Sequence, residues 1–179
     1  VSKEILAAKG GQLKLFHHEL RAALGPIISH AGELGQVAGL RYGFGEVSWT
    51  LGFGLNIGQS AYRGPGDQRE ESWLGGDIRL DHRRFLGPLD FHYGASWRVI
   101  KQKVQLDQAN LLDAAGISST TRLTGFGAGP SLGLGWRRGL SNTWSLAMEF
   151  GGTALFVREG TDMAVRPESS FQLALMAEL

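Results

Sequence analysis

The chain has 179 residues, 18 Lys and Arg against 17 Asp and Glu, 27 glycines and no cysteine. The lack of cysteine excludes a disulfide framework, a thiolate metal site and a catalytic thiol. The formal charge of +1 excludes the concentrated basic surface of a nucleic-acid-binding protein, and we predict no nucleic-acid partner. No stretch of sequence approaches the ~18 consecutive apolar residues of a transmembrane helix. This criterion does not detect membrane-spanning strands, because their apolar and polar residues alternate.

Residues 1–11 are predicted to form a separate N-terminal segment ahead of a barrel domain at residues 12–179. Within it, residues 2–9 predict a short helix, because Gly10 and Gly11 follow as helix stops. The first residue is Val1 rather than Met, and we expect a mature form or a fragment.

A period of two runs through most of the chain and predicts strands. It is clearest from Val47 to Ile57, where apolar residues take the odd positions and small or polar residues take the even ones. Two weaker segments, near Leu20 and Leu40, complete the set. The prediction is an all-β fold of eight antiparallel strands, at residues 14–28, 36–44, 46–63, 72–83, 88–104, 120–137, 143–157 and 168–179.

The predicted connections alternate between short and long. Short turns are expected at Phe44 and Gly45, at 83–87 and at 138–142, whereas 29–35, 64–71, 105–119 and 158–167 are longer and more polar. Short turns at one end and longer loops at the other are typical of an up-and-down transmembrane β-barrel. A meander of eight strands that closes on itself also leaves no unpaired edge.

The third long loop contains a predicted short helix at residues 107–116. Asp107 is a suitable N-cap and Gly116 a suitable C′ residue. This helix would present Leu111, Leu112 and Ile117 either to a protein partner or to the mouth of the barrel, and the sequence leaves both alternatives open.

The charges decide which face meets lipid, because they follow the polar parity of the strands while the apolar parity carries no charge within its belt. The apolar series from Val47 to Ile57 would span roughly 28 Å at about 3.3 Å per residue and a ~40° tilt, close to the ~25 Å belt of a membrane barrel. A soluble ligand-binding barrel remains the alternative. The aromatic girdles are predicted from residues near the two borders of this belt: Phe44, Trp49, Tyr62, Trp136, Trp144 and Phe156.

The inward charges predict an ionic network that seals the lumen, because an eight-stranded barrel is filled by its own side chains; Glu46 and Glu178 share this polar parity. Folding the fourth hairpin about Phe85 would bring Asp81 near Asp90. Ion conduction is the alternative. The predicted network consists of Glu19, Arg21, Arg41, Asp77, Arg79, Asp81, Asp90, His92, Arg98, Arg137 and Glu149.

No catalytic residues, metal ligands or cofactors are predicted. Asp90, His92 and Ser96 share one strand face, but four residues of strand separate His92 from Ser96 by some 13 Å, beyond hydrogen-bond reach. Pro130 interrupts the sixth strand, and a bulge beside Gly129 is the favoured explanation.

The final strand carries Phe171, Leu173, Leu175 and Ala177 at alternate positions, and the whole pattern resembles the small eight-stranded outer-membrane proteins, the OmpX and OmpA transmembrane-domain class. The resemblance covers roughly residues 14–179. Leu179 stands where that class typically ends in an aromatic residue that the assembly machinery reads.

The resemblance implies a location in the cell outer membrane and contact with the lipid bilayer, with lipopolysaccharide and with the outer-membrane assembly machinery. We predict a noncatalytic membrane anchor whose loops serve interaction or protection at the cell surface, with a surface or periplasmic protein as a further partner. Two alternatives stay open. One is an enzyme that modifies lipid A, and the other is the anchor domain of a larger protein.

Overall fold

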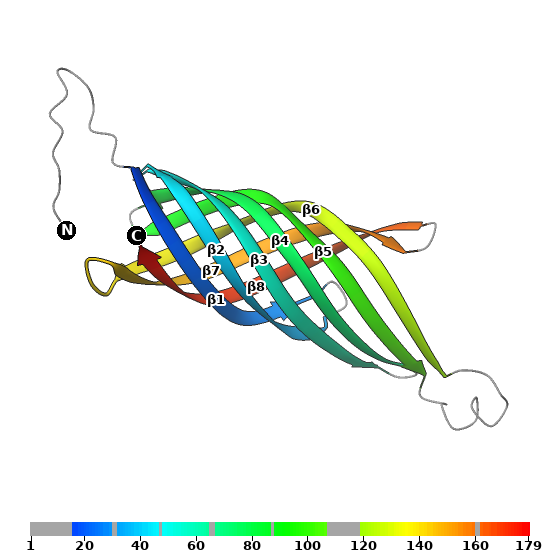
Figure 1. The fold of residues 1–179 in the computed structure, drawn as a ribbon. Coiled ribbons are helices and arrows are strands. Elements are labelled where there is room, and N and C mark those ends of the chain that lie inside the picture. The colour runs from blue at the N-terminus through cyan, green and yellow to red at the C-terminus, as the bar shows by residue number, and fades with distance from the viewer. Residues whose placement is uncertain are drawn as a thin grey trace, which may run out of the picture.

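The computed structural model describes residues 16–29, 32–46, 48–64, 67–86, 88–106, 119–159 and 162–179. They form eight β-strands and one closed barrel (Figure 1). The strands are β1 (Phe16–Ile28), β2 (Leu34–Glu46), β3 (Trp49–Gly64), β4 (Asp67–Leu86), β5 (Leu89–Leu106), β6 (Thr120–Gly139), β7 (Trp144–Glu159) and β8 (Asp162–Glu178).

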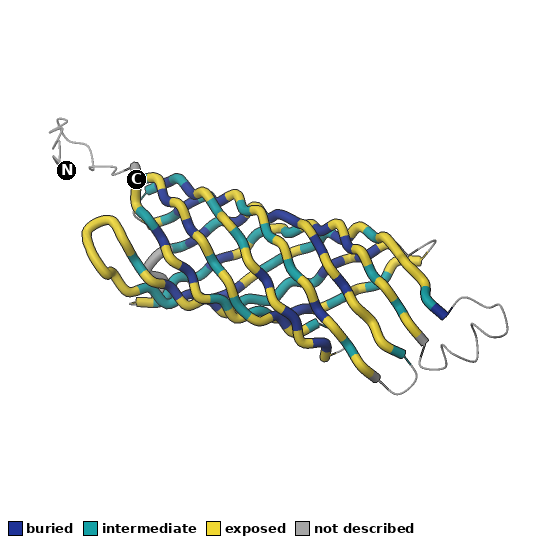
Figure 2. Tube along the Cα trace, turned by 60° about the horizontal axis from the view of Figure 1, so that its bottom comes forward, coloured by how far each residue is buried: buried dark blue, intermediate teal, exposed yellow. Residues whose placement is uncertain are grey.

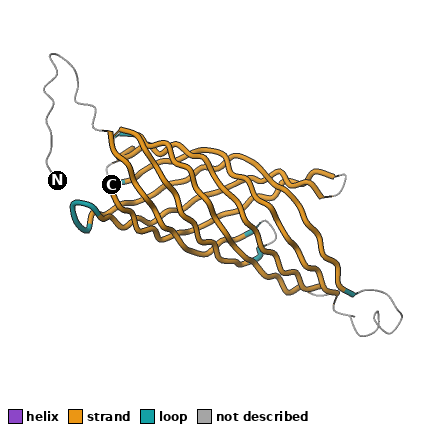
Figure 3. The backbone as a smooth tube through the Cα atoms, in the orientation of Figure 1, coloured by secondary structure: helices purple, strands orange, loops and turns teal. Residues whose placement is uncertain are grey.

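Every strand pairs antiparallel with its sequence neighbours, and β8 pairs with β1 to close the barrel (Figure 3). The strands are strongly staggered. When paired residues are followed around the barrel from His17 of β1, the path reaches β1 again at Ile27, ten residues further along the chain. This shear makes the strands tilt against the barrel axis. The fold confirms the predicted all-β, eight-stranded, up-and-down barrel.

The two faces of the barrel differ as the period-two pattern predicts. Leu55 and Leu132 on the outer face are 63% and 62% exposed, whereas Glu19 and Arg79 on the inner face are 1% and 4% exposed. Figure 2 shows the resulting alternation of buried and exposed positions along each strand. A soluble barrel would have the opposite arrangement, because its charged side chains would face water. The described part of the chain holds no helix that is long and apolar enough to cross a membrane.

The short-turn end differs from the prediction at its first turn. Phe44 and Gly45 lie within β2, which continues to Glu46, and the turn falls at residues 47–48. The other two connections at this end lie at residues 87–88 and 140–143. The prediction was wrong because Gly45 signals a turn only by composition, whereas its backbone pairs with both His17 and Thr50.

At the opposite end, which we call the loop end, two of the four predicted loops are largely strand. β3 and β4 together leave only residues 65–66 between them, and β7 and β8 leave only 160–161. The loops predicted at 64–71 and 158–167 were therefore wrong over most of their length. Beyond the apolar belt the outward face of a hairpin meets water and carries polar residues, so the apolar alternation stops while backbone pairing continues.

The hairpin of β4 and β5 also has a different register from the predicted one. Asp81 pairs with His92, and Arg79 pairs with Gly94, because the irregular stretch between His82 and Leu86 moves the turn beyond Phe85. The expected pair of facing carboxylates at positions 81 and 90 is therefore not formed.

Pro130 does not lie in a bulge. On the β5 side its pairing with Ala95 is continuous, and on the β7 side the register is the same before and after a gap at positions 129–130. The gap follows from the missing N–H of proline, and the predicted bulge was wrong. The helices predicted at 2–9 and 107–116, with Leu111, Leu112 and Ile117, lie outside the described residues.

Candidate functional site in the barrel interior

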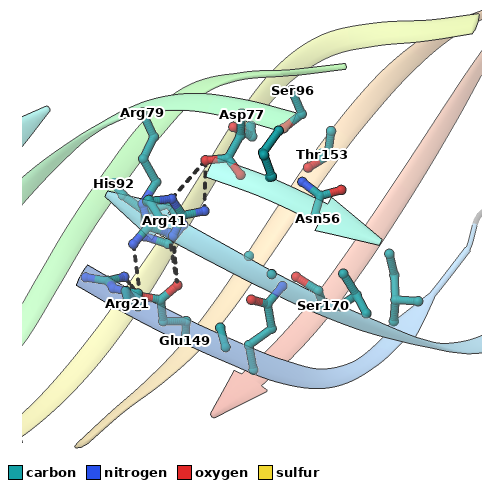
Figure 4. Close-up of a pocket in the computed structure, with 18 of the residues that line it drawn as sticks. Arg21, Arg41, Asn56, Asp77, Arg79, His92, Ser96, Glu149, Thr153 and Ser170 are labelled. Carbon is teal, nitrogen blue, oxygen red and sulfur yellow. Dashed lines mark hydrogen bonds and ion pairs between the residues drawn. The ribbon is translucent and has the colours of Figure 1, made fainter. Parts of the chain in front are cut away.

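The centre of the interior ionic network is Glu149 of β7, whose side chain faces three arginines (Figure 4). Arg79 of β4 donates two hydrogen bonds to it, from Nη1 to Oε2 at 2.9 Å and from Nη2 to Oε1 at 3.0 Å. Arg21 of β1 forms an ion pair with the same carboxylate, and Nη1 of Arg41 lies 4.0 Å from Oε2. One acid therefore connects β7 with three strands that are not its neighbours in the sheet.

The arginines bind further acids of β4. Nε of Arg41 donates to Oδ1 of Asp77 at 2.9 Å, and Nε of Arg79 donates to Oδ2 of Asp81 at 3.1 Å. Nδ1 of His92 lies 4.0 Å from Oδ1 of Asp81. Since Arg79 also binds Glu149, its guanidinium joins two carboxylates from opposite walls of the lumen.

A third group of contacts closes the network toward the short-turn end. Nη2 of Arg137 lies 3.2 Å from Oδ2 of Asp90, and its Nη1 lies 3.8 Å from Oε2 of Glu19. Glu19 in turn lies 3.5 Å from Nη2 of Arg21. We call the whole set the basal ion cluster; it consists of Glu19, Arg21, Arg41, Asp77, Arg79, Asp81, Asp90, His92, Arg137 and Glu149.

A second interior layer lies toward the loop end. Arg98 forms an ion pair with Glu168 and stacks over Trp73, with 4.8 Å between its Cζ and the ring centroid. Nη1 of Arg166 donates to Oε2 of Glu71 at 2.9 Å. Around these pairs lies a buried apolar cluster of Ile27, Val37, Trp73, Ile100, Leu155 and Val157.

A polar cavity of about 90 Å³ lies between the two layers. Arg79 and His92 of the basal ion cluster line it on one side, and Ile27 and Val37 line it on the other. Its walls between them are small or amide side chains, as Figure 4 shows for Asn56 and the hydroxyl residues Ser96, Thr153 and Ser170. The cavity has room for water molecules, and its polar walls offer them hydrogen bonds.

The structure brings ten of the eleven residues of the predicted lumen network into one set of contacts. Arg98 is the exception, because it belongs to the second layer. Glu46 is partly buried and Glu178 is exposed, and both lie at the short-turn rim. The sequence reasoning missed the partners in the second layer, namely Glu71, Arg166 and Glu168.

A signal for these missed residues was present in their parity. Glu71 lies on the same face of β4 as Asp77, and Arg166 and Glu168 lie on the same face of β8 as Gln172. The predicted loops at 64–71 and 158–167 concealed the parity of Glu71 and Arg166, because a residue in a loop has no fixed face. Glu168 lies at the start of the predicted strand 168–179, where its inward parity was already present.

The predicted aromatic girdle is found on the outer face, with one exception. Phe44 stacks on Phe53 with ring centroids 6.1 Å apart, and Trp144 and Phe156 are 46% and 47% exposed. Trp49 and Trp136 are partly exposed on the same parity. Tyr62 is the exception, because it shares the inward parity of Thr50 and Ser60 on β3, and its assignment to the girdle was wrong.

The strand that carries Asp90, His92 and Ser96 uses these side chains separately. Asp90 contacts Arg137 and His92 approaches Asp81, while Ser96 lines the cavity. Among the residues that the structure describes, no cluster of three or more His, Cys, Asp or Glu side chains could hold a metal ion.

Comparison with known proteins gives structural neighbours only. No family model matches the chain, and no curated protein matches it in sequence. The chain is similar in structure to Neisserial surface protein A (NspA), with a TM-score of 0.53 and 13% identity over 92% of this chain and 97% of that one. It is similar to Ail, the attachment invasion locus protein of Yersinia pestis, with a TM-score of 0.53 and 8% identity over 92% and 97%. The N-terminal β-barrel domain of OprF from Pseudomonas aeruginosa aligns with a TM-score of 0.48 and 13% identity over 91% and 97%.

The protein has the fold of the small outer-membrane β-barrels, the class that the sequence pattern resembles. Together with the exposed apolar outer face, this fold supports the predicted location in the outer membrane and a membrane-anchored surface protein.

Proposed function

We propose that the protein is a noncatalytic anchor in the outer membrane, with a lumen sealed by its own side chains. The observation that carries the proposal is the basal ion cluster, because its contacts join six strands across the barrel, from β1 to β7. Buried charges that are paired on several sides resist hydration and separation. The surface activity then belongs to the loop end, including the connection 107–119 with Leu111, Leu112 and Ile117.

Planar-bilayer recording of the folded full chain tests the sealed lumen. The expected result is a baseline current at moderate voltage, and regular single-channel steps from the unaltered protein would refute the proposal. The variant Glu149→Ala is expected to produce steps, because Arg21, Arg41 and Arg79 lose their shared acceptor and water enters between them. The matched control is Glu70→Ala, which removes an acid that is 71% exposed in its side chain.

The lipid A-modifying enzyme remains a second candidate because of the prolines. The pairing of β1 with β8 is interrupted at Gly25 and Pro26, and the pairing of β6 with β7 is interrupted at Gly129 and Pro130. Ile27 and Ser131, the residues that follow these gaps, line the polar cavity. Incubation with lipopolysaccharide followed by mass analysis of lipid A decides the question, since gain or loss of an acyl chain would establish catalysis.

A further inference from the structure

Two Gly-Pro pairs interrupt the barrel wall, one on each side of the hairpin of β7 and β8. Pairing between β1 and β8 stops at Gly25 and Pro26, and pairing between β6 and β7 stops at Gly129 and Pro130. Proline has no N–H to donate to the next strand, and a Cβ added to either glycine would overlap a carbonyl oxygen of that strand. Both edges of the hairpin are therefore interrupted.

Beyond these interruptions the hairpin has little lateral support. Its loop-end part, which we call the upper hairpin, consists of residues 154–159 of β7 and 162–170 of β8, which pair with each other. Its described pairing with β6 is confined to residues 126–128, and its pairing with β1 to Ile27 and Ile28. Figure 1 shows the ends of β7 and β8 (orange) diverging from β6. A two-stranded ribbon is marginally stable by itself, so this part of the wall has low local stability.

The upper hairpin forms part of the wall of the polar cavity. Its Ser170 lines the cavity, and so do Ile27 and Ser131, the residues that follow the two prolines. The basal ion cluster lies on the other side of the cavity, and its Glu149 lies on β7 before the interruption. Movement of the upper hairpin would therefore expose the cavity toward the loop end and leave the basal ion cluster in place.

Two ion pairs fasten the upper hairpin to strands that are not its neighbours in the sheet. Glu168 binds Arg98 of β5, and Arg166 donates a hydrogen bond of 2.9 Å to Glu71 of β4. The four side chains are at most 12% exposed. Removing one partner of such a pair leaves a buried charge uncompensated. Contacts across the lumen thus hold the upper hairpin where pairing along the wall is weak.

We propose that the upper hairpin is a hinged gate that closes the polar cavity from the loop end. The two Gly-Pro interruptions are its hinges, and the two ion pairs are its latch. In the closed position Leu155 and Val157 of the gate are buried in the apolar cluster. The gate goes beyond the sealed anchor, because the basal ion cluster stays closed in both positions.

The cavity behind the gate fits a small uncharged solute. Its volume of about 90 Å³ excludes a large molecule, and its arginines and carboxylates already form ion pairs. Two polar atoms of its lining, Nε of Arg98 and Oδ1 of Asn56, are buried and have no hydrogen-bond partner within the part of the chain that the structure describes. Buried polar atoms require partners, and a solute that carries both an acceptor and a donor supplies them.

Hydrogen–deuterium exchange of the detergent-folded full chain tests the hinges. Residues 154–170 should exchange about tenfold faster than residues 98–104 of β5, which pair without interruption on both sides. The double variant Ala128→Cys, Phe156→Cys joins a directly paired couple beyond the β6 interruption, at a spacing that a disulfide can bridge. Its oxidised form should exchange about fivefold more slowly in residues 154–170 than its reduced form. The natural chain contains no cysteine that could interfere.

Alkylation of a single cysteine in the cavity tests the latch. Iodoacetamide, a small uncharged amide, is added to the variant Ser96→Cys, whose altered residue lines the cavity, and intact mass reports the reaction. Adding Glu168→Gln removes the charge that Arg98 binds and should accelerate alkylation on the order of tenfold. The matched control Glu70→Gln breaks an exposed ion pair on the outer face and should leave the rate unchanged.

Three results would overturn the proposal: equal exchange in residues 154–170 and 98–104, equal exchange in the oxidised and reduced double variant, or equal alkylation with and without Glu168→Gln. A heat-modifiable band on an SDS gel reports folding of each variant. Should Glu168→Gln fail to fold, Arg166→Gln breaks the other ion pair of the latch and must accelerate alkylation instead. The gate and the sealed anchor fail separately, because channel recording tests the basal ion cluster and exchange tests the upper hairpin.

Discussion

Small residues in the lumen make space for the charged side chains around them. A Cβ added to Gly52 would lie 2.9 Å from Cδ of Arg41, and one added to Gly54 would lie 2.6 Å from Oδ2 of Asp77. At Gly58 an added Cβ would overlap the ring of Trp73. The high glycine content is therefore a steric requirement of a narrow barrel that encloses large ionic and aromatic groups.

Gly133 provides a direct test of this requirement. An added Cβ there would lie 2.5 Å from both Nε2 of His92 and the carbonyl oxygen of Phe150. We expect Gly133→Leu to lower the free energy of unfolding by about 1–3 kcal/mol or more, because backbone and cluster must both shift. Urea unfolding in detergent, followed by the gel shift of the folded form, measures the change. Gly139→Leu is the control, since nothing lies within 4 Å of its added Cβ, and similar losses in both variants would contradict the steric explanation.

At the scale of the strand, the apolar alternation ends at the border of the membrane belt, whereas the strands themselves continue beyond it. β4 begins at Asp67 and pairs along its whole outer part with β3 and β5, although residues 67–72 are all polar. Hairpin pairing outside the membrane depends on the neighbouring strands rather than on the alternation of the segment itself. The extended hairpins at the loop end carry Lys101, Lys103 and Arg122 beyond the apolar belt.

Pro130 is a strand-level weak point whose replacement should strengthen the barrel. Its pairing partner Ala95 on β5 is retained, whereas pairing with β7 lapses between Ala128 and Ser131. Pro130→Leu restores an N–H toward β7 and should stabilise the barrel by about 1 kcal/mol. We expect slower amide exchange in peptides of β6 and β7, read by hydrogen–deuterium exchange with mass spectrometry.

The matched control for this change is Ala95→Leu. It adds a comparable side chain at the position paired with Pro130 but supplies no new donor. Equal stabilisation by the two variants would show that added apolar surface, and not the restored hydrogen bond, is responsible.

At the scale of the whole molecule, the outer face must match lipid, and Leu132 lies in the middle of β6 with 62% exposure. We expect Leu132→Arg to destabilise the barrel in lipid vesicles by about 2–4 kcal/mol, since a cation near the bilayer midplane loses hydration. Leu140→Arg, with 59% of Leu140 exposed at the short-turn end, should cost less than about 1 kcal/mol. Equilibrium unfolding in vesicles measures both, and equal costs would contradict a membrane-embedded belt.

The sequence determined the number of strands, their order and, within the apolar belt, the face that most residues take. The reason is local: alternate side chains point to opposite sides of a strand, so the positions of Glu19, Arg79 and Glu149 already separate them from Leu20, Ile78 and Phe150. The same alternation indicated an apolar outer face. This assignment of faces does not depend on which side chains meet across the lumen.

Only the tertiary structure decided which charges meet. Arg79 binds Glu149 on a strand 70 residues away, and Arg98 binds Glu168 because the barrel closes with a stagger of ten residues between His17 and Ile27. The register of each hairpin depends on where its turn falls, and a shift of the turn beyond Phe85 replaced the expected partner of Asp81 with His92. Which charged side chains face each other across the lumen depends on the registers of all the hairpins together, and no single segment of the sequence encodes them.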